Sequence, residues 1–158
     1  MYHEELLRRD PVHAMPMTFS ALMDMYEQNY LMLRVLCGEI PDSPAKVISK
    51  APGKAQDLHL FMIESTPHTV TLKLTYLFPN QELKPDLMVR IYKDAQQAEV
   101  LSRKCRVTGN NLKVDSGVSD TALYCRWQLN RFLYKWLRYC KRQGHSFQSL
   151  EWSSLSPE

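Results

Sequence analysis

The segment Glu64-Ser65-Thr66-Pro67-His68 places a hydroxyl and an imidazole three residues apart. A serine becomes a nucleophile when a histidine base lies within hydrogen-bond reach of its hydroxyl. A proline-containing turn, whose Ser and Thr hydroxyls satisfy the local backbone, explains the same residues. We favour the turn and assign no catalytic residue in this chain.

A second polar group contains Arg90, Tyr92, Asp94 and Glu99. Carboxylates beside an arginine are suited to acid–base chemistry. In the structural alternative, Arg90 and Glu99 pair across two strands while Asp94 holds the turn. If Glu64 projects from a neighbouring strand, then Glu64, Arg90, Tyr92 and Glu99 would form a patch that contacts a small molecule or a peptide. These residues, with Asp94, are the candidate binding site on the sheet.

The segment between Thr121 and Leu150 has six Lys or Arg residues and no Asp or Glu. The whole chain has 20 basic and 17 acidic residues, so this segment carries +6 and the remainder, with 14 basic residues, carries −3. Four cations recur at helical spacing: Arg131, Lys135, Arg138 and Arg142. Such a stripe is either an ordinary solvated face, favoured by the helix dipole, or a surface for an anionic partner such as RNA or an acidic protein. Trp127 and Tyr134 lie beside it, where they either stack on a base or pack against the sheet.

The remaining sequence features favour neither a cofactor nor a membrane. The four cysteines are scattered, so we expect buried thiols rather than a zinc site. The five glycines are dispersed and form no phosphate-binding loop. No apolar run is long enough to span a bilayer, and the N-terminus MYHEELLRRD lacks the apolar centre of a signal peptide. We therefore expect a cytoplasmic protein without a metal or cofactor.

An amphipathic helix is predicted towards each end of the chain. Thr18 is suited to cap the first helix and Gly38 to end it. Its expected apolar face contains Phe19, Leu22, Tyr26, Tyr30, Leu33 and Cys37. Asn29 lies close to this face, where it is either a hydrogen-bonded structural residue or a lining residue; we favour the former. The second helix is predicted from an Asp120 cap to Gly144, with an apolar face of Cys125, Leu129, Phe132, Leu133, Trp136 and Cys140.

Strand patterns fill the region between the helices. Residues 46–50 are predicted as an edge strand, and residues 58–65, 69–78 and 87–92 as further strands. The residues after Asp94 either begin a helix or return as a strand. We favour the returning strand, in which Ile91 faces Ala98, Val89 faces Val100 and Arg90 faces Glu99. One more short strand is predicted at Leu112 to Val114.

These elements predict a single α+β domain at residues 17–145. It is a two-layer sandwich in which an antiparallel sheet of four to six strands carries both helices on one face. Residues 1–16 are assigned to a loosely ordered tail, and residues 146–158 to a Ser-rich C-terminal tail.

Three stretches of the chain carry a resemblance. They are ALMDMYEQNYLMLRVL (21–36), the pair MIESTPHTVTLKL (62–74) and MVRIYKDAQQAEV (88–100), and QLNRFLYKWLRYC (128–140). In this order they resemble the YqiB-like family, a bacterial group of unknown function. Residues Gly109 to Asp120 stand in place of the aromatic and proline-rich loop that the family tends to show before its last helix. The resemblance implies a small cytosolic protein and brings no activity, cofactor or catalytic residue.

Taken together, these features predict a non-enzymatic binding or adaptor protein. Two alternatives remain open. One is an RNA or polyanion binder that uses Arg131, Lys135, Arg138 and Arg142. The other is a small-molecule binder or hydrolase that uses the polar cluster on the sheet.

Overall fold

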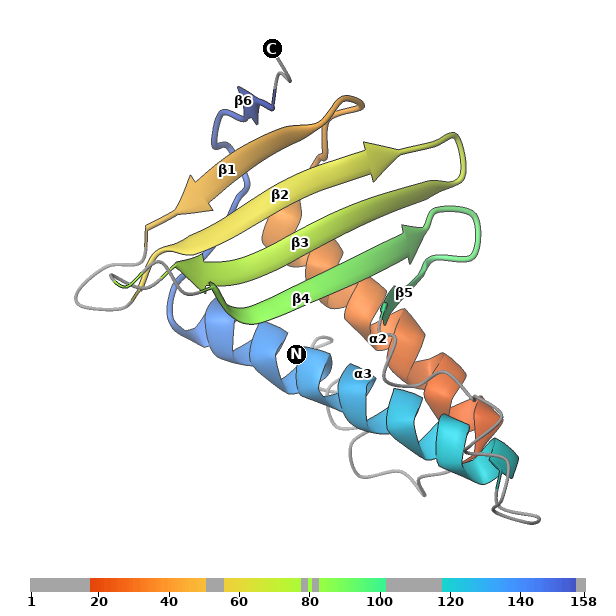
Figure 1. Ribbon diagram of the computed structural model, residues 1–158. Coiled ribbons are helices and arrows are strands. Elements are labelled where there is room, and N and C mark those ends of the chain that lie inside the picture. Colours follow the sequence, from red (N-terminus) through yellow and green to blue (C-terminus); the bar gives the residue numbers. More distant parts are fainter. Residues whose placement is uncertain (1–17, 51–55, 78–79, 81–82, 102–117, 156–158) are drawn as a thin grey trace, which may run out of the picture.

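The protein forms two layers, an antiparallel sheet and a pair of long helices (Figure 1). The computed structural model describes residues 18–50, 56–77, 80, 83–101 and 118–155. Within these residues the order of elements is α2, β1, β2, β3, β4, β5, α3 and β6. This α+β sandwich, with both helices on one face of the sheet, confirms the predicted fold class.

Helix α2 spans Phe19–Cys37 and has the ends that its sequence predicts. The Thr18 side chain accepts a hydrogen bond from the Ala21 backbone N–H at 3.0 Å. At the other end Gly38 adopts φ +69°, a conformation in which a side chain would be strained. A Cβ atom at Gly38 would also lie 3.0 Å from Cγ of Gln148. Glycine therefore allows the C-terminal segment to pack against the end of α2.

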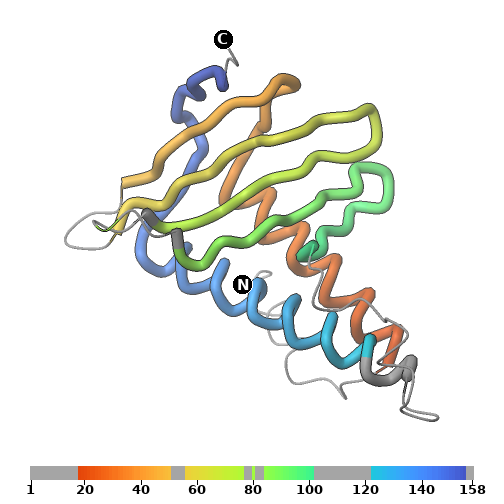
Figure 2. The backbone as a smooth tube through the Cα atoms, in the orientation of Figure 1, coloured from red at the N-terminus to blue at the C-terminus, as the bar shows by residue number. Residues whose placement is uncertain are grey.

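Helix α3 spans Val118–Arg142. It begins two residues before Asp120, so the predicted Asp120 cap is wrong. The predicted ending is confirmed, because Gly144 has φ +91° and its N–H bonds to the carbonyl of Lys141 at 3.0 Å. In Figure 2 the two helices run beneath the sheet. The N-terminal ends of α2 and α3 extend past the edge of the sheet.

The sheet has six strands in the order β5-β4-β3-β2-β1-β6, and every neighbouring pair is antiparallel. The strands are Ala45–Ser49 (β1), Leu58–Ser65 (β2), Thr69–Leu77 (β3), Leu83–Tyr92 (β4), Gln97–Val100 (β5) and Ser153–Ser154 (β6). The returning strand is confirmed in its register, since Ile91 pairs with Ala98, Val89 with Val100 and Arg90 with Glu99. Strand β4 begins earlier than predicted, and β6 was not predicted because two serines carry no strand pattern. The strand predicted at Leu112 to Val114 lies outside the described residues.

The core lies between the sheet and the helices. A main cluster joins five strands to α2, α3 and the buried Phe147. A second, smaller cluster holds the two helices together: Ala21, Leu22, Met25, Tyr26, Trp127 and Tyr134. Helix α3 therefore buries one side against the sheet and another against α2.

This double burial corrects several expectations about individual side chains. Phe19 is 67% exposed and Phe132 is 46% exposed, although both were placed on apolar faces. Trp127 and Tyr134 are buried, so the alternative in which they stack on a base is wrong. The apolar arc of α3 is wider than a single stripe and is rotated towards α2, which turns Phe132 outwards.

The cysteines do not behave alike. Burial raises the pKa of the Cys37 thiol to about 12 and that of the Cys140 thiol to about 11, so both remain protonated at neutral pH. Cys125, in contrast, is disulfide-bonded. The expectation of four thiols is wrong at this position, because spacing along the chain does not reveal which cysteines approach each other.

Neither α2 nor α3, within the described residues, is apolar over a stretch long enough to cross a bilayer.

Candidate functional site

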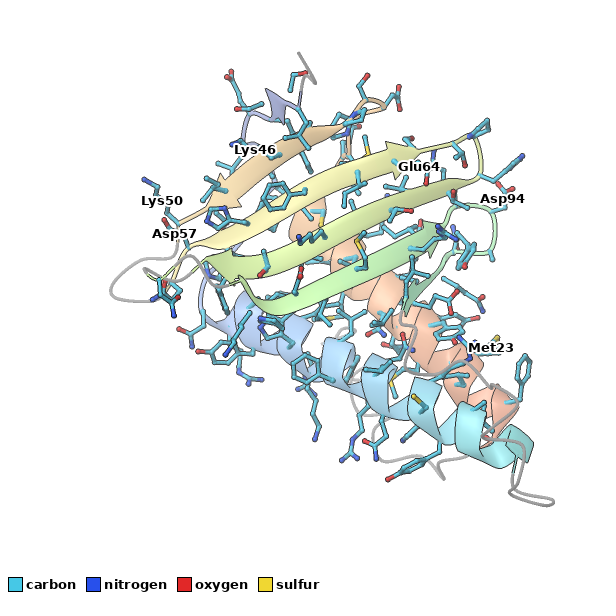
Figure 3. All side chains as sticks on the ribbon, in the orientation of Figure 1. Met23, Lys46, Lys50, Asp57, Glu64 and Asp94 are labelled. Carbon is cyan, nitrogen blue, oxygen red and sulfur yellow. The ribbon has the colours of Figure 1, made fainter. Side chains whose placement is uncertain are left out.

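Of the polar residues predicted on the sheet, Tyr92 lies against both Arg90 and Glu99, while Glu64 and Asp94 lie apart from them. The Arg90 Nε donates to the Thr71 hydroxyl at 3.3 Å. Asp94, in the turn after β4, accepts from the Nδ1 of His68 at 3.0 Å, and both side chains are more than 70% exposed. Glu64 lies exposed on β2. Figure 3 shows Glu64 and Asp94 near the hairpin ends of the sheet. Glu64 and Asp94 are therefore exposed, whereas Arg90 is half-buried.

The Glu99 carboxylate contacts Tyr92 of β4 and Arg126 of α3 rather than the Arg90 guanidinium. Its carboxylate accepts a short hydrogen bond from the Tyr92 hydroxyl, and its other oxygen lies 4.0 Å from an Arg126 nitrogen on α3. Burial, with the nearby Glu99 carboxylate, raises the pKa of Tyr92 and of Tyr26 above the ordinary tyrosine range. Both phenols therefore stay protonated and can donate to Glu99. This arrangement fastens the β5 edge to the helices.

The Thr66–Thr69 segment is the self-satisfied turn that the sequence suggests. The Thr66 hydroxyl accepts from the backbone N–H groups of His68 and Thr69 at 3.2 and 2.9 Å. His68 is held by Asp94, while Ser65 lines a groove on the helix side of the sheet. The imidazole is therefore engaged with a carboxylate outside that groove.

The basic stripe of α3 lies on the side of the helix away from the sheet, and Arg138 lies at its border with α2. Lys135 and Arg142 are exposed, and Arg131 and Arg138 are half-buried. The Arg138 guanidinium lies over the Tyr134 ring, 5.6 Å from its centroid. The Nε of Arg131 is buried without a hydrogen-bond partner among the described residues. Each of these two arginines is thus partly covered by the helix pair.

Three aromatic side chains share this exposed side of α3. Tyr124 is 46% exposed, Phe132 is 46% exposed and Tyr139 is 44% exposed. At 100° per residue, they fall within one helical arc with Lys135 and Arg142. The sequence pattern pointed to the wrong aromatics, but their helical positions, next to the cations, were a signal that could have found them.

A hollow of about 320 Å³ lies at the C-terminal end of this side. It is lined by Met32 of α2 and by Arg138, Lys141 and Arg142 of α3. Lys141 was not among the predicted stripe residues, because it lies one helical step to the side. Three cations around an apolar floor make this hollow suited to an anionic group, such as a phosphate.

Metal chemistry has no evident support in the described part of the chain. No group of three or more His, Cys, Asp and Glu side chains there is arranged to hold a metal ion.

The chain is similar to proteins whose function is unknown. Residues 32–146 match the family model described as "Protein of unknown function (DUF1249)". The relatives include "Uncharacterized protein YqiB" of Escherichia coli strain K12, which is 33% identical over 134 residues, covering 80% of this chain and 90% of the relative. The proteins of the same name from the O6:H1 strain CFT073 and from O157:H7 match with the same identity and coverage. No solved structure matches the chain significantly.

Proposed function

This chain belongs to the protein family of unknown function DUF1249, and we propose that it is a binding protein that engages single-stranded RNA through the exposed side of α3. The observation that carries this proposal is that exposed aromatics and exposed cations lie together there. We call this surface the α3 face and define it by Tyr124, Arg131, Phe132, Lys135, Arg138, Tyr139, Lys141 and Arg142.

The charge of the α3 face suits a chain of phosphates. Its five cations lie between residues 131 and 142, and the sequence from Thr121 to Leu150 has no acidic residue to neutralise them. Ordinary soluble surfaces mix charges of both signs. The helix dipole favours cations only in the last turn, which accounts for Lys141 and Arg142 but not for Arg131 or Lys135. A row of cations on a helix that has no acidic residue after Asp120 is the electrostatic footprint of a polyanion site.

The aromatic side chains favour a single strand over a duplex. Tyr124, Phe132 and Tyr139 each leave more than 40% of their surface in water. Exposed aromatic rings beside cations can stack on unpaired bases, whose faces are accessible only outside a double helix. Because stacking does not read the base edge, we expect little sequence preference.

The first test is the binding of a fluorescein-labelled uridine 20-mer, followed by fluorescence anisotropy between 50 and 300 mM KCl. Charge reversal at two exposed cations, Lys135→Glu with Arg142→Glu, should weaken binding by more than tenfold. The slope of log K against log[salt] should fall by at least about 1.4, because two phosphate contacts contribute roughly 0.7 each on a single strand. Arg131 and Arg138 are left intact because their stems are half-buried.

The matched control is Lys46→Glu with Lys50→Glu. These lysines are exposed at β1, and their reversal changes the net charge by the same amount. Figure 3 shows both on the sheet, away from α3. The control should keep most of the wild-type affinity. Equal losses in the two double variants would show a nonspecific charge effect, and an unchanged affinity in the α3 variant would reject the proposal. Preferential binding of a heparin fragment or an acidic peptide would identify a different polyanion.

A second test concerns stacking. Phe132→Ala should reduce the binding free energy by about 1–3 kcal/mol without altering the salt slope, because it removes no charge. Phe19→Ala is the control, since Phe19 is more exposed but lies at the start of α2. If the two variants bind the 20-mer equally well, Phe132 does not stack on the RNA.

A further inference from the structure

The hollow at the C-terminal end of the α3 face has a volume of about 320 Å³. Three of its lining residues are the cations Arg138, Lys141 and Arg142 of α3, and the fourth is Met32 of α2. Lys141 and Arg142 are exposed, whereas Arg138 and Met32 are half-buried. A volume at the lower end of the range of small-molecule sites suits one terminal group rather than a length of strand.

The lining of this hollow contains no carboxylate. Among the described residues, no Asp or Glu side chain lies within 4.0 Å of the Lys141 ammonium or the Arg142 guanidinium. The Tyr134 ring positions the third cation, because the Arg138 guanidinium lies 5.6 Å from its centroid. Arginine binds phosphate through paired N–H donors and lysine binds it as a point charge, so the three cations together suit a phosphate group.

The end of α3 does not cancel this positive charge. The C-terminus of a helix carries a partial charge of roughly −0.5, which opposes anion binding. In α3 the carbonyls of Tyr139, Cys140 and Lys141 accept hydrogen bonds from the backbone N–H groups of residues 143–145 at 3.0 to 3.1 Å. Three full positive charges therefore outweigh a helix end whose carbonyls are already hydrogen-bonded.

The row of cations on α3 ends at the hollow. Arg142 is the last residue of the helix, and no Lys or Arg follows it in the chain, whereas Glu151 and Glu158 do. The next segment turns towards the end of α2, where the Phe147 N–H donates to the Leu36 carbonyl at 2.8 Å. A strand that follows the cations of α3 therefore meets the last of them at the hollow.

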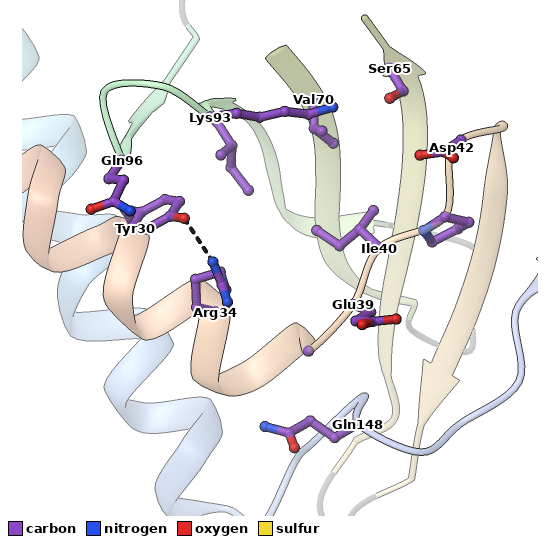
Figure 4. Close-up of a pocket in the computed structure, with 13 residues that line it drawn as sticks. Tyr30, Arg34, Glu39, Ile40, Asp42, Ser65, Val70, Lys93, Gln96 and Gln148 are labelled. Carbon is purple, nitrogen blue, oxygen red and sulfur yellow. Dashed lines mark hydrogen bonds between the residues drawn. The ribbon is translucent and has the colours of Figure 1, made fainter. Parts of the chain in front are cut away.

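A larger groove of about 980 Å³ beside the C-terminal half of α2 lacks this one-sided charge. Its lining includes the carboxylates of Glu39 and Asp42 besides its cations. Figure 4 shows one of these cations, Arg34, against Tyr30, whose hydroxyl accepts a hydrogen bond from the Arg34 guanidinium at 2.9 Å. An anion in that groove meets charges of both signs, so the hollow is the better site for a phosphate.

We propose that the hollow binds the terminal phosphomonoester of an RNA strand that lies along the α3 face, an inference that rests on the RNA binding proposed above. A phosphomonoester carries about −1.5 to −2 at pH 7, whereas an internal diester carries only about −1. A terminal phosphate therefore gains more than an internal one from three cations gathered around one hollow. The protein thus distinguishes a phosphorylated end of a strand from a hydroxyl end.

The test compares uridine oligonucleotides by isothermal titration calorimetry with the full-length protein. A hexamer with a 5′-phosphate and a hexamer with a 3′-phosphate are set against a heptamer with hydroxyl groups at both ends, which has the same number of phosphate groups. At least one phosphorylated hexamer should bind about tenfold more tightly than the heptamer, because its additional charge is met by charge-assisted hydrogen bonds. A heptamer that binds as tightly as both hexamers would overturn the proposal.

Lys141→Met removes one cation of the hollow, and Lys135→Met is the matched control on the exposed side of α3 outside the hollow. In Lys141→Met the preference for the phosphorylated end should fall below about threefold. Lys135→Met should weaken the hexamers and the heptamer to the same extent, so that the ratio of their affinities stays unchanged. The same ratio in the two variants would show that the hollow does not recognise the end.

The outcomes separate this proposal from RNA binding itself. Strands that all bind with a steep salt dependence but without an end preference would keep RNA binding and reject the end site. If no strand binds, RNA binding is rejected, and uridine 5′-monophosphate measured against uridine tests the hollow alone. Binding of the nucleotide that is lost in Lys141→Met would support a phosphomonoester site for a free nucleotide, and absence of such binding would overturn it.

Discussion

At the scale of single residues, His145 is a buried titratable group at the junction of β1 and the segment after α3. It is 3% exposed, and its Nδ1 lies 2.9 Å from the hydroxyl of Ser49, which is 2% exposed. The same hydroxyl accepts from the Ser146 backbone N–H at 3.2 Å. The Ser49 hydroxyl can therefore donate its own proton to the Nδ1 of a neutral imidazole while its oxygen accepts from Ser146. This pair fastens the chain after α3 to strand β1.

The neutral state of His145 predicts how stability depends on pH. Burial lowers the pKa of His145, against smaller opposing effects from the Gln56 and Ser49 backbone and from Asp57. The unfolded chain therefore binds more protons than the folded protein between the lowered pKa and the ordinary value near 6.5. The contribution of His145 is fully present above about pH 6.5 and is lost as pH falls towards the folded-state pKa. Urea denaturation between pH 8 and pH 5 should show this decline, at most about 1.4 kcal/mol per pH unit from one proton.

His145→Asn is the variant that isolates this effect. It should lower stability at pH 8, and it should remove the His145 share of the decline below pH 6.5. Burial also lowers the pKa of His59, so His59 contributes to the same loss of stability at low pH. His59→Asn measures that contribution. A decline that is as steep in His145→Asn as in the wild type would show that His145 is not its source.

At the scale of elements, Asn130 connects α3 to both of its neighbours. Its side-chain oxygen accepts from the backbone N–H of Val100 in β5 at 2.9 Å. Its side-chain nitrogen donates to the carbonyl of Arg126 at 2.8 Å. Its own carbonyl accepts from the side chain of Asn29 in α2 at 3.2 Å. One buried residue therefore supplies hydrogen bonds to an edge strand and to the other helix.

Asn130→Leu should destabilise the protein by about 1–3 kcal/mol, because the buried N–H of Val100 loses its acceptor. Urea denaturation measures the loss, and amide exchange at Val100 should become faster. Gln128→Leu is the control on the exposed side of the same helix, where a change within about 0.5 kcal/mol is expected. Equal stability of Asn130→Leu and wild type would mean that the Val100 N–H finds another acceptor, such as water.

The elements also show what the sequence could predict. Alternation of apolar and polar residues was enough to predict the β4–β5 register. A slip of one residue would turn every apolar side chain of β5 outwards. The structural role of Asn29 was predicted from its place on an apolar face. Its partner was not, because the pairing of α2 with α3 joins residues 101 positions apart. The packing of α2 on α3 also determines which aromatic residues of α3 are buried. The periodicity of a single helix carries no information about that packing.

The candidate sites were less predictable for a related reason. The cations of α3 follow from helical spacing alone, so the stripe was found. Glu99 was paired with Arg90 on the evidence of strand register, but the structure turns it to Tyr92 and to Arg126 of α3. The groove that Ser65 lines is formed by α2, the α2–β1 connection, three strands, the turn after β4 and the C-terminal segment. No local sequence pattern marks such a convergence.

At the scale of the whole molecule, the two core clusters divide the protein into two parts that are held by different numbers of buried side chains. The main cluster is covered by the sheet on one side and by both helices on the other. The second cluster contains residues of α2 and α3 only. Figure 1 shows why, because these ends of the helices extend past the sheet. The molecule thus has a core between the sheet and both helices. It also has a two-helix extension, held by the second cluster and by the contacts of Glu99 with Tyr26 and Arg126.

This division predicts two levels of opening in native-state hydrogen exchange. Amides of residues 19–27 and 122–128 should exchange through an opening of lower free energy than amides of β3, because fewer buried contacts hold them. Leu22→Ala removes a side chain from the second cluster, where Leu22 is 2% exposed. It should lower the protection of both helix ends by about 2–5 kcal/mol. Leu33→Ala, at 1% exposed in the main cluster, should lower the protection of β3 as well. A single free energy shared by all these amides, shifted equally by both variants, would show that the helix extension and the sheet-backed core open as one unit.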